Sequence, residues 1–148
     1  MAYIYELEYT VHSVIENLDD AGLPEGDPEI SITTAKGFFK TADERSLISY
    51  SENTDGGRVL TDISITEDSV ILSKRGAVVF DVTFKEGETA KTVYSIPPYS
   101  FDAVITTKRI RADITKSGGE IRLLYSMNIG GQGKSVRLRI SARPIARA

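Results

Sequence analysis

Apolar and polar residues alternate along most of the chain, which is the period of a β-strand with one buried face. In the opening stretch, one face collects the apolar positions Tyr3, Tyr5, Leu7, Tyr9 and Val11. Stretches with helical spacing are scarce. Turn signals such as Asp55-Gly56 and Pro97-Pro98 separate the alternating stretches at short intervals. The pattern predicts about nine strand segments joined mostly by tight turns.

Consecutive antiparallel strands with one apolar face form either a barrel or a sandwich. We expect an all-β fold, a single closed antiparallel up-and-down β-barrel of about eight to nine strands that covers residues 1–148. Closure is favoured because it removes the exposed edges of a long meander. It makes the first and last strands neighbours, so Glu6 and Glu8 would pair across strands with Arg137 and Arg139 on the outer face.

Three places interrupt the alternation. Residues 14–29 predict an irregular acidic loop, in which Ser13 and Glu16 cap a short helical turn. Residues 144–148 predict a flexible C-terminal tail. The apolar parity flips near Thr106-Thr107, which predicts a β-bulge or a bend there.

The stretch VILSKRGAVVFDVTF, residues 70–84, keeps one parity through its central Lys74-Arg75-Gly76. A two-residue hairpin loop would reverse that parity, whereas a three-residue bulged loop would keep it. We favour one continuous strand bent at Gly76 over a hairpin. In that strand Lys74 shares the inward face with the apolar residues, and Arg75 faces outward.

Composition changes this picture little. The chain has 148 residues, 41% of them hydrophobic and 26% charged, values typical of one soluble globular domain. It has no cysteine, which excludes disulfides and thiol chemistry. No apolar run is long enough to cross a bilayer and no export signal opens the chain, so we expect a cytoplasmic protein without a membrane partner. No feature of the sequence indicates an oligomeric state.

Charge is distributed unevenly. Residues 1–100 carry 8 basic and 18 acidic side chains, whereas residues 101–148 carry 10 basic and 3 acidic ones. A basic stripe of this kind is the electrostatic footprint of a nucleic-acid-binding face; its members are Lys108, Arg109, Arg111, Lys134, Arg137, Arg139, Arg143 and Arg147. Aromatic residues for base stacking are not interleaved with it, and its outward arginines have candidate acidic partners. The sequence therefore disfavours nucleic acid as a partner without excluding it.

The sequence offers few candidates for catalytic or metal-binding residues. His12 is the only histidine, and no nucleophile elbow accompanies it, so a hydrolytic triad is not expected. Zinc sites need clusters of histidine and cysteine. The acidic residues between Asp19 and Glu29 lack the spacing of a calcium-binding EF-hand loop. We expect no catalytic residue, no metal and no cofactor.

Several short motifs, taken in order, resemble the YwiB-like family of uncharacterised bacterial proteins. The matching motifs lie within about residues 30–142 and are Gly37-Phe38-Phe39, Tyr50-Ser51-Glu52, Lys74-Arg75-Gly76, Phe84 with Gly87, Tyr94 with Pro97, Thr107 with Ile110, and Tyr125. The family usually has a glycine just after the proline, where this chain has Pro98. Its basic residue usually lies two positions before the glycine, which selects Lys74. The resemblance implies a lipocalin-like (calycin) barrel with an interior pocket, and no established activity.

The barrel interior is where the sequence places function. Small barrels either fill with side chains or hold one small ligand, and hydroxyls on an apolar wall can orient such a ligand. The interior and mouth candidates are Tyr50, Glu52, Lys74, Arg75, Tyr94 and Tyr125. A basic residue paired there with Glu52 would be a structural tie or a ligand anchor, and we favour the tie.

We therefore expect a non-enzymatic binding protein for a small, partly apolar molecule. The first alternative is a protein- or RNA-interaction module that uses the basic C-terminal face. The least favoured is an enzyme with carboxylate and tyrosine groups at the barrel mouth.

Overall fold

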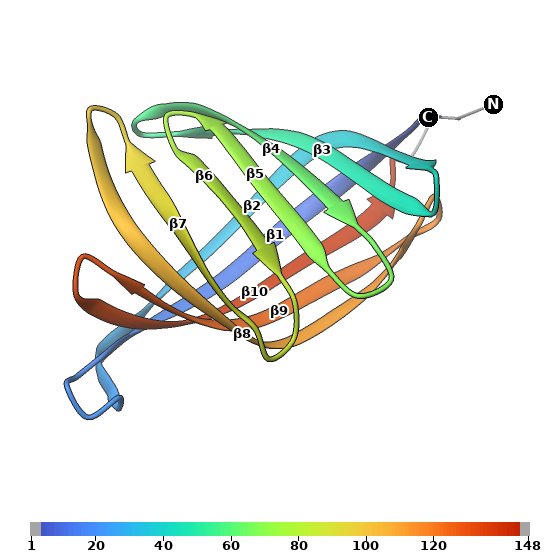
Figure 1. Ribbon diagram of the computed structural model, residues 1–148. Coiled ribbons are helices and arrows are strands. Elements are labelled where there is room, and N and C mark those ends of the chain that lie inside the picture. Colours follow the sequence, from blue (N-terminus) through green and yellow to red (C-terminus); the bar gives the residue numbers. More distant parts are fainter. Residues whose placement is uncertain (1–3, 146–148) are drawn as a thin grey trace.

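Ten antiparallel strands form one closed barrel in the computed structural model, which describes residues 4–145 (Figure 1). The strands are β1 (Ile4–Leu18), β2 (Pro24–Ala42), β3 (Arg45–Thr54), β4 (Gly57–Ile65), β5 (Val70–Gly76), β6 (Val79–Phe84), β7 (Thr89–Ile96), β8 (Tyr99–Thr115), β9 (Gly118–Ile129) and β10 (Gln132–Pro144). Each strand pairs with its neighbours in sequence, and β10 pairs with β1 to close the barrel. The predicted closed up-and-down barrel is confirmed. In the described part of the chain, no helix is long and apolar enough to cross a membrane.

The strand count is ten rather than about nine because Val70–Phe84 is a hairpin and not one bent strand. Lys74 pairs with Phe80, so five residues lie between the last paired positions of β5 and β6. An odd number of intervening residues preserves the parity, which is why the alternation continued through the turn. Gly76 has a φ of +111°, and a Cβ there would lie 2.2 Å from the carbonyl oxygen of Arg58. Glycine is required at this position by backbone conformation and by close approach to β4.

The predicted irregular loop over residues 14–29 is wrong for most of its length. Strand β1 continues to Leu18 and β2 begins at Pro24, so residues 19–23 alone form the connection. No helical turn forms at Ser13 and Glu16, because β1 pairs with β10 and β2 on its two sides there. Those cross-strand hydrogen bonds outweigh a local cap. Of the predicted C-terminal tail, Pro144 ends β10 and residues 146–148 lie outside the described residues.

The predicted bulge in β8 is confirmed. The register between β8 and β9 shifts between Thr107 and Arg109, with Lys108 as the extra residue. The loop before β7 holds this bulge: the Glu86 carboxylate accepts a hydrogen bond of 2.8 Å from the backbone N–H of Ile110. The backbone N–H of Gly87 also donates to the carbonyl oxygen of Thr107 at 2.9 Å. The bulge reverses the inward parity, so that even-numbered residues face the interior after it.

Strands β1 and β10 are neighbours as predicted, but their acidic and basic residues pair differently. Glu8 lies opposite Arg143 and forms an ion pair with it. Arg137 lies opposite Val14, and its guanidinium is 4.0 Å from the Glu16 carboxylate. The predicted pairing of Glu6 and Glu8 with Arg137 and Arg139 is therefore wrong. Parity fixes which face a residue occupies, whereas the register of two strands depends on the turns between them.

Inward side chains fill one end of the barrel. It is the end at which β1 begins and β10 ends (Figure 1). The most deeply buried apolar side chains there are Leu7, Ile48, Ile63, Val70, Phe84, Ile105, Ile121 and Ile140. The opposite end carries the turns that join β1 to β2, β3 to β4, β5 to β6, β7 to β8 and β9 to β10. This second end is not filled, and it holds the candidate site.

Candidate functional site

A cavity of about 470 Å³ opens inside the barrel at the end opposite the packed core. This volume lies within the range of small-molecule sites, roughly 300–1,000 Å³. The wall combines apolar side chains with hydroxyls and charged groups in nearly equal number. Its apolar residues are Val11, Ile15, Leu72, Phe80, Ile96, Phe101, Met127, Ile129, Val136 and Leu138, and its polar ones are Ser13, Glu29, Ser31, Thr33, Glu52, Lys74, Tyr94, Tyr125 and Lys134.

Cross-strand register places three of the six candidate residues, Tyr50, Lys74 and Tyr94, in one row across the sheet. Tyr50 lies opposite Thr61, Thr61 lies opposite Lys74, Lys74 lies opposite Phe80, and Phe80 lies opposite Tyr94. Residues in such a row point to the same face of the sheet, which here is the interior. Alternation along each strand is therefore sufficient to direct these side chains inward, although they come from five different strands.

Aromatic rings separate the cavity from the packed core. The ring of Tyr125 packs on Phe84 with centroids 4.7 Å apart, and the ring of Tyr94 meets Phe80 at 5.2 Å in an edge-to-face arrangement. Burial raises the pKa of both tyrosine hydroxyls above the ordinary value, so they remain protonated hydrogen-bonding groups near neutral pH. Together these rings form the floor of the cavity, and the hydroxyls of Tyr94 and Tyr125 are its two polar groups.

Tyr50 lies in the packed part of the barrel rather than on the cavity wall. It is 3% exposed, and its ring packs on Tyr9 at 5.4 Å. The Tyr9 hydroxyl donates to the carbonyl oxygen of Phe38 at 2.9 Å. Burial, and to a smaller extent the Glu52 carboxylate, raises the pKa of Tyr50. Tyr50 therefore belongs to the packed core of the barrel.

Lys74 and Glu52 are the charged candidates on the cavity wall. Burial lowers the pKa of Lys74, and the Glu52 carboxylate offsets part of that effect. The Glu52 carboxylate accepts a hydrogen bond of 2.6 Å from the hydroxyl of Thr33. Within residues 4–145, no ion pair within 4.0 Å joins Lys74 to a carboxylate, and no side-chain hydrogen bond reaches its ammonium. The structural tie that we favoured from the sequence thus lacks its contact, and the ammonium stays available to a ligand.

Arg75 lies on the outer face, as the parity predicted. Its guanidinium donates to the Asp81 carboxylate at 2.9 Å, and both side chains are more than half exposed. The hydrogen bond from Arg75 holds the pKa of Asp81 below its usual range. This ion pair spans the β5–β6 hairpin and has no access to the cavity. Of the six sequence candidates, the structure brings Glu52, Lys74, Tyr94 and Tyr125 together on the cavity wall and leaves Tyr50 and Arg75 off it.

Two charged residues on the cavity wall escaped the sequence analysis. Glu29 was assigned to an acidic loop and Lys134 to an outer basic stripe, but both line the cavity. The Lys134 ammonium donates to the side-chain oxygen of Asn17 at 2.9 Å. The signal that could have found them is parity: Lys134 shares the register of Val136 and Leu138, and Glu29 that of Ser31 and Thr33.

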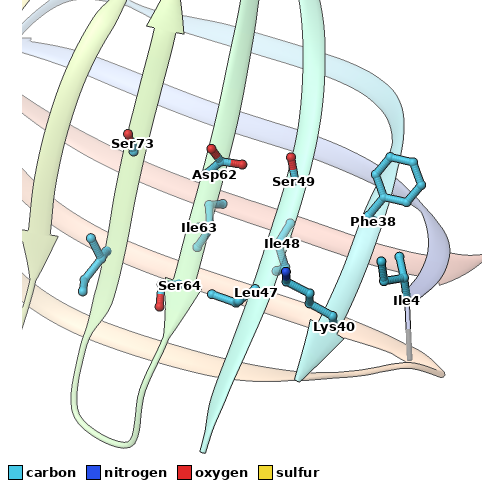
Figure 2. Close-up of a pocket in the computed structure, with 11 residues that line it drawn as sticks. Ile4, Phe38, Lys40, Leu47, Ile48, Ser49, Asp62, Ile63, Ser64 and Ser73 are labelled. Carbon is cyan, nitrogen blue, oxygen red and sulfur yellow. The ribbon is translucent and has the colours of Figure 1, made fainter. Parts of the chain in front are cut away.

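A second hollow lies on the outside of the barrel, over strands β1 to β5 (Figure 2). It has a volume of about 540 Å³ and an apolar lining to which Ile4, Phe38, Leu47 and Ile71 contribute. Phe38 is 51% exposed. The polar side chains shown in Figure 2 are Lys40, Ser49, Asp62, Ser64 and Ser73. None of the six sequence candidates lines this outer groove, which offers apolar molecules a second place to bind.

Metal ligands do not gather in the described residues, where no group of three or more histidine, aspartate or glutamate side chains converges. The chemistry available at the cavity is instead that of hydroxyl, ammonium and carboxylate groups on a mixed apolar and polar wall. Such a wall can hold an amphipathic molecule and orient its polar end.

The fold and the cavity define a class of protein: a closed antiparallel barrel that is packed at one end and hollow at the other. Residues 23–140 match the family described as a domain of unknown function, DUF1934, and the chain belongs to that family. A curated relative, the uncharacterised β-barrel protein YwiB of Bacillus subtilis (strain 168), is 27% identical over 129 residues, which are 86% of each chain. The crystal structure of the ywiB protein from Bacillus subtilis superposes with a TM-score of 0.84 at 25% identity, covering 97% of this chain and 94% of that one. The resemblance drawn from the sequence motifs is confirmed.

Proposed function

We propose that this protein is a non-enzymatic binding protein that holds one small, partly apolar molecule in the barrel cavity. The observation that carries the proposal is the Lys74 ammonium, which lies on the wall of this mixed apolar and polar cavity without a hydrogen-bond or ion-pair partner among the described residues. A buried ammonium gains most from an acidic or hydrogen-bond-accepting group. The ligand class is therefore an apolar body with an anionic or acceptor head, its head at Lys74 and its body against Met127 and Leu138.

The polar groups around Lys74 support this orientation. Tyr94 and Tyr125 have raised pKa values and can donate a hydrogen bond to the same head group. The Glu52 carboxylate accepts a hydrogen bond from the Thr33 hydroxyl, and its charge acts on the Lys74 ammonium without direct contact. The aromatic floor excludes the ligand from the packed core. No side chain in this arrangement acts as a nucleophile with a positioned base, so binding without turnover is the simplest use of the site.

The first experiment identifies what the protein carries. Native mass spectrometry of the freshly purified wild type and of Lys74→Met should show an added small mass on the wild type that is reduced in the variant. The second experiment uses defined probes of equal tail length: octanoate, octylammonium and octanol, each titrated by calorimetry. We expect octanoate to bind most tightly, and Lys74→Met to weaken octanoate by about 10- to 100-fold, the value of a charge-assisted hydrogen bond, while octanol changes little.

Two variants distinguish the cavity from the outer groove. Ser13→Phe places a large side chain in the cavity and should abolish binding of all three probes. Phe38→Ser alters the outer groove and should leave binding unchanged. Loss of binding in Phe38→Ser but not in Ser13→Phe, or absence of both a copurified mass and probe binding, would contradict the proposal.

A further inference from the structure

Five exposed arginines gather on the outer face of strands β8, β9 and β10, in a shallow groove of about 490 Å³. We call this surface the arginine groove; its arginines are Arg109, Arg111, Arg122, Arg137 and Arg139. His12, Val14, Leu123, Leu124 and Leu138 complete its lining, and no carboxylate contributes to it. It lies on the other side of the barrel wall from the cavity and does not depend on the function proposed above.

The strand register places like charges directly opposite one another. Arg122 lies opposite Arg111 on one side and opposite Arg139 on the other, so three guanidiniums occupy one row across three strands. Arg109 and Arg137 lie on either side of Leu124 in the next row. Like charges in directly opposed positions destabilise a sheet. An anion bound over this row would offset the repulsion between its guanidiniums.

Acidic neighbours neutralise only part of the groove. Arg122 forms an ion pair of 2.6 Å with Glu120, and Arg137 has Glu16 at 4.0 Å. The other three arginines form no ion pair with any residue between 4 and 145. The sequence suggested that acidic residues of the first strand would neutralise these arginines. They do not, because Glu8 lies opposite Arg143, outside the groove.

The β8 bulge is what completes the groove. Before the bulge, odd-numbered residues such as Thr107 face inward. If Lys108 occupied an ordinary position in the ladder instead of the bulge, Arg109 and Arg111 would continue that parity and point into the barrel. The bulge turns both outward, beside Arg122 and Arg137. A local irregularity of the sheet thus supplies two of the five charges.

We propose that the arginine groove binds the sugar–phosphate backbone of a nucleic acid. All five cations are arginines, whose planar guanidinium matches phosphate oxygens with paired hydrogen bonds. Those in one row lie on adjacent strands about 4.8 Å apart, which gives a continuous line of donors. No tryptophan, tyrosine or phenylalanine lines the groove, so the contact is mainly with the backbone and carries little sequence preference.

Fluorescence polarisation with labelled 16-nucleotide probes tests the proposal. The probes are single-stranded RNA, duplex RNA and duplex DNA, and each is titrated with the full chain at four KCl concentrations between 25 and 200 mM. We expect binding to at least one probe at 25 mM KCl, with affinity falling as salt rises. Three to five phosphate contacts correspond to a log–log slope of about −3 to −4.5 on duplex probes and about −2 to −3.5 on the single strand.

The variant Arg111→Gln with Arg139→Gln should reduce the magnitude of the slope by about 1.4–1.8, because each lost phosphate contact removes roughly 0.7–0.9. The control is Arg58→Gln with Arg75→Gln, which removes the same charge from strands β4 and β5. It should retain wild-type binding. Equal losses in both double variants would show that net charge and not the groove is responsible. Absence of binding to every probe at 25 mM KCl, or binding only to anionic lipid vesicles or to a polyglutamate peptide, would overturn the proposal.

Discussion

The role of Lys74 can be decided by measuring stability in the absence of any ligand. In the folded chain, burial disfavours its ammonium, and the Glu52 carboxylate offsets part of that cost. Methionine resembles the lysine stem in length and carries no charge, so Lys74→Met removes the desolvated charge with little loss of packing. If the residue is kept for a ligand, the variant should be more stable than the wild type.

Replacing buried ionised groups by apolar side chains of similar volume is often neutral or stabilises a protein by about 1–4 kcal/mol. Because the Glu52 carboxylate offsets part of the cost of burying Lys74, we expect a gain at the lower end of that range at pH 7. The sign of the pH dependence is also fixed. A lysine in the unfolded chain titrates near about 10.4, above its folded value, so between those two values the unfolded state binds more protons. Wild-type stability therefore rises with pH in that window, and the advantage of the variant should shrink from pH 7 to pH 10.

Urea denaturation at pH 7 and at pH 10, analysed by linear extrapolation, measures both quantities. Arg75→Met is the matched control, because it changes the adjacent residue and breaks an exposed ion pair with Asp81. It should cost at most about 1 kcal/mol, equally at both pH values. A variant Lys74→Met that is less stable than the wild type at pH 7 would refute the reasoning. Lys74 would then be a structural tie to Glu52.

Three further predictions concern the fold. Arg139→Gln should raise the free energy of unfolding by about 0.2–1 kcal/mol at 10 mM salt and by almost nothing at 1 M salt, because it relieves a like-charge row; a loss of thermal stability at low salt would contradict this. Phe84→Ala, in the packed end, should cost about 3–5 kcal/mol, whereas Ile96→Ala, which is 47% exposed at the cavity, should cost below about 1 kcal/mol. Equal costs by urea denaturation would mean that the barrel is uniformly packed. Replacing Asp43-Glu44, whose φ angles are 49° and 64°, by Asn-Gly should stabilise the chain by about 1 kcal/mol, and a lower unfolding temperature would show that this turn is not strained.

Alternation predicted the barrel well because one buried face imposes a period of two on every strand. It also located the bulge, since an extra residue at Lys108 shifts the parity of everything after it. Gly130-Gly131, both with positive φ, connect β9 to β10 at the predicted turn. These features are local in sequence, and the chain carries the full signal for each of them.

Features that depend on pairing were predicted less well. The five-residue connection between Lys74 and Phe80 keeps the parity, so alternation could not distinguish a hairpin from a continuous strand. Ser13 and Glu16 carry a capping pattern, but pairing with two neighbouring strands overrides it. Barrel closure predicted that the first and last strands are neighbours, but it did not give the register that joins Glu8 to Arg143.

In the candidate site too, features that are local in sequence were predicted and features that depend on packing were not. Parity alone directed Lys74 inward and Arg75 outward, and both placements agree with the structure. Tyr50 also points inward, but how deeply a barrel packs depends on side chains from all ten strands, so its burial in the packed core was not predictable. Lys134 was missed because its charge was read as a surface property, although its register with Val136 marked it as an inward residue.

The two proposed sites share one wall of the barrel, and this explains why the register of β10 matters to both. Leu138 faces the cavity, while its neighbours Arg137 and Arg139 face the arginine groove. A slip of one residue would exchange the two faces and bury the arginines. The ion pair between Glu8 and Arg143 helps to hold this strand in register from one side. On the other side Glu86 holds the bulge that turns Arg109 and Arg111 outward. Because a single sheet layer separates the sites, substitutions at the arginines change no atom of the cavity wall, so each proposal can fail without the other.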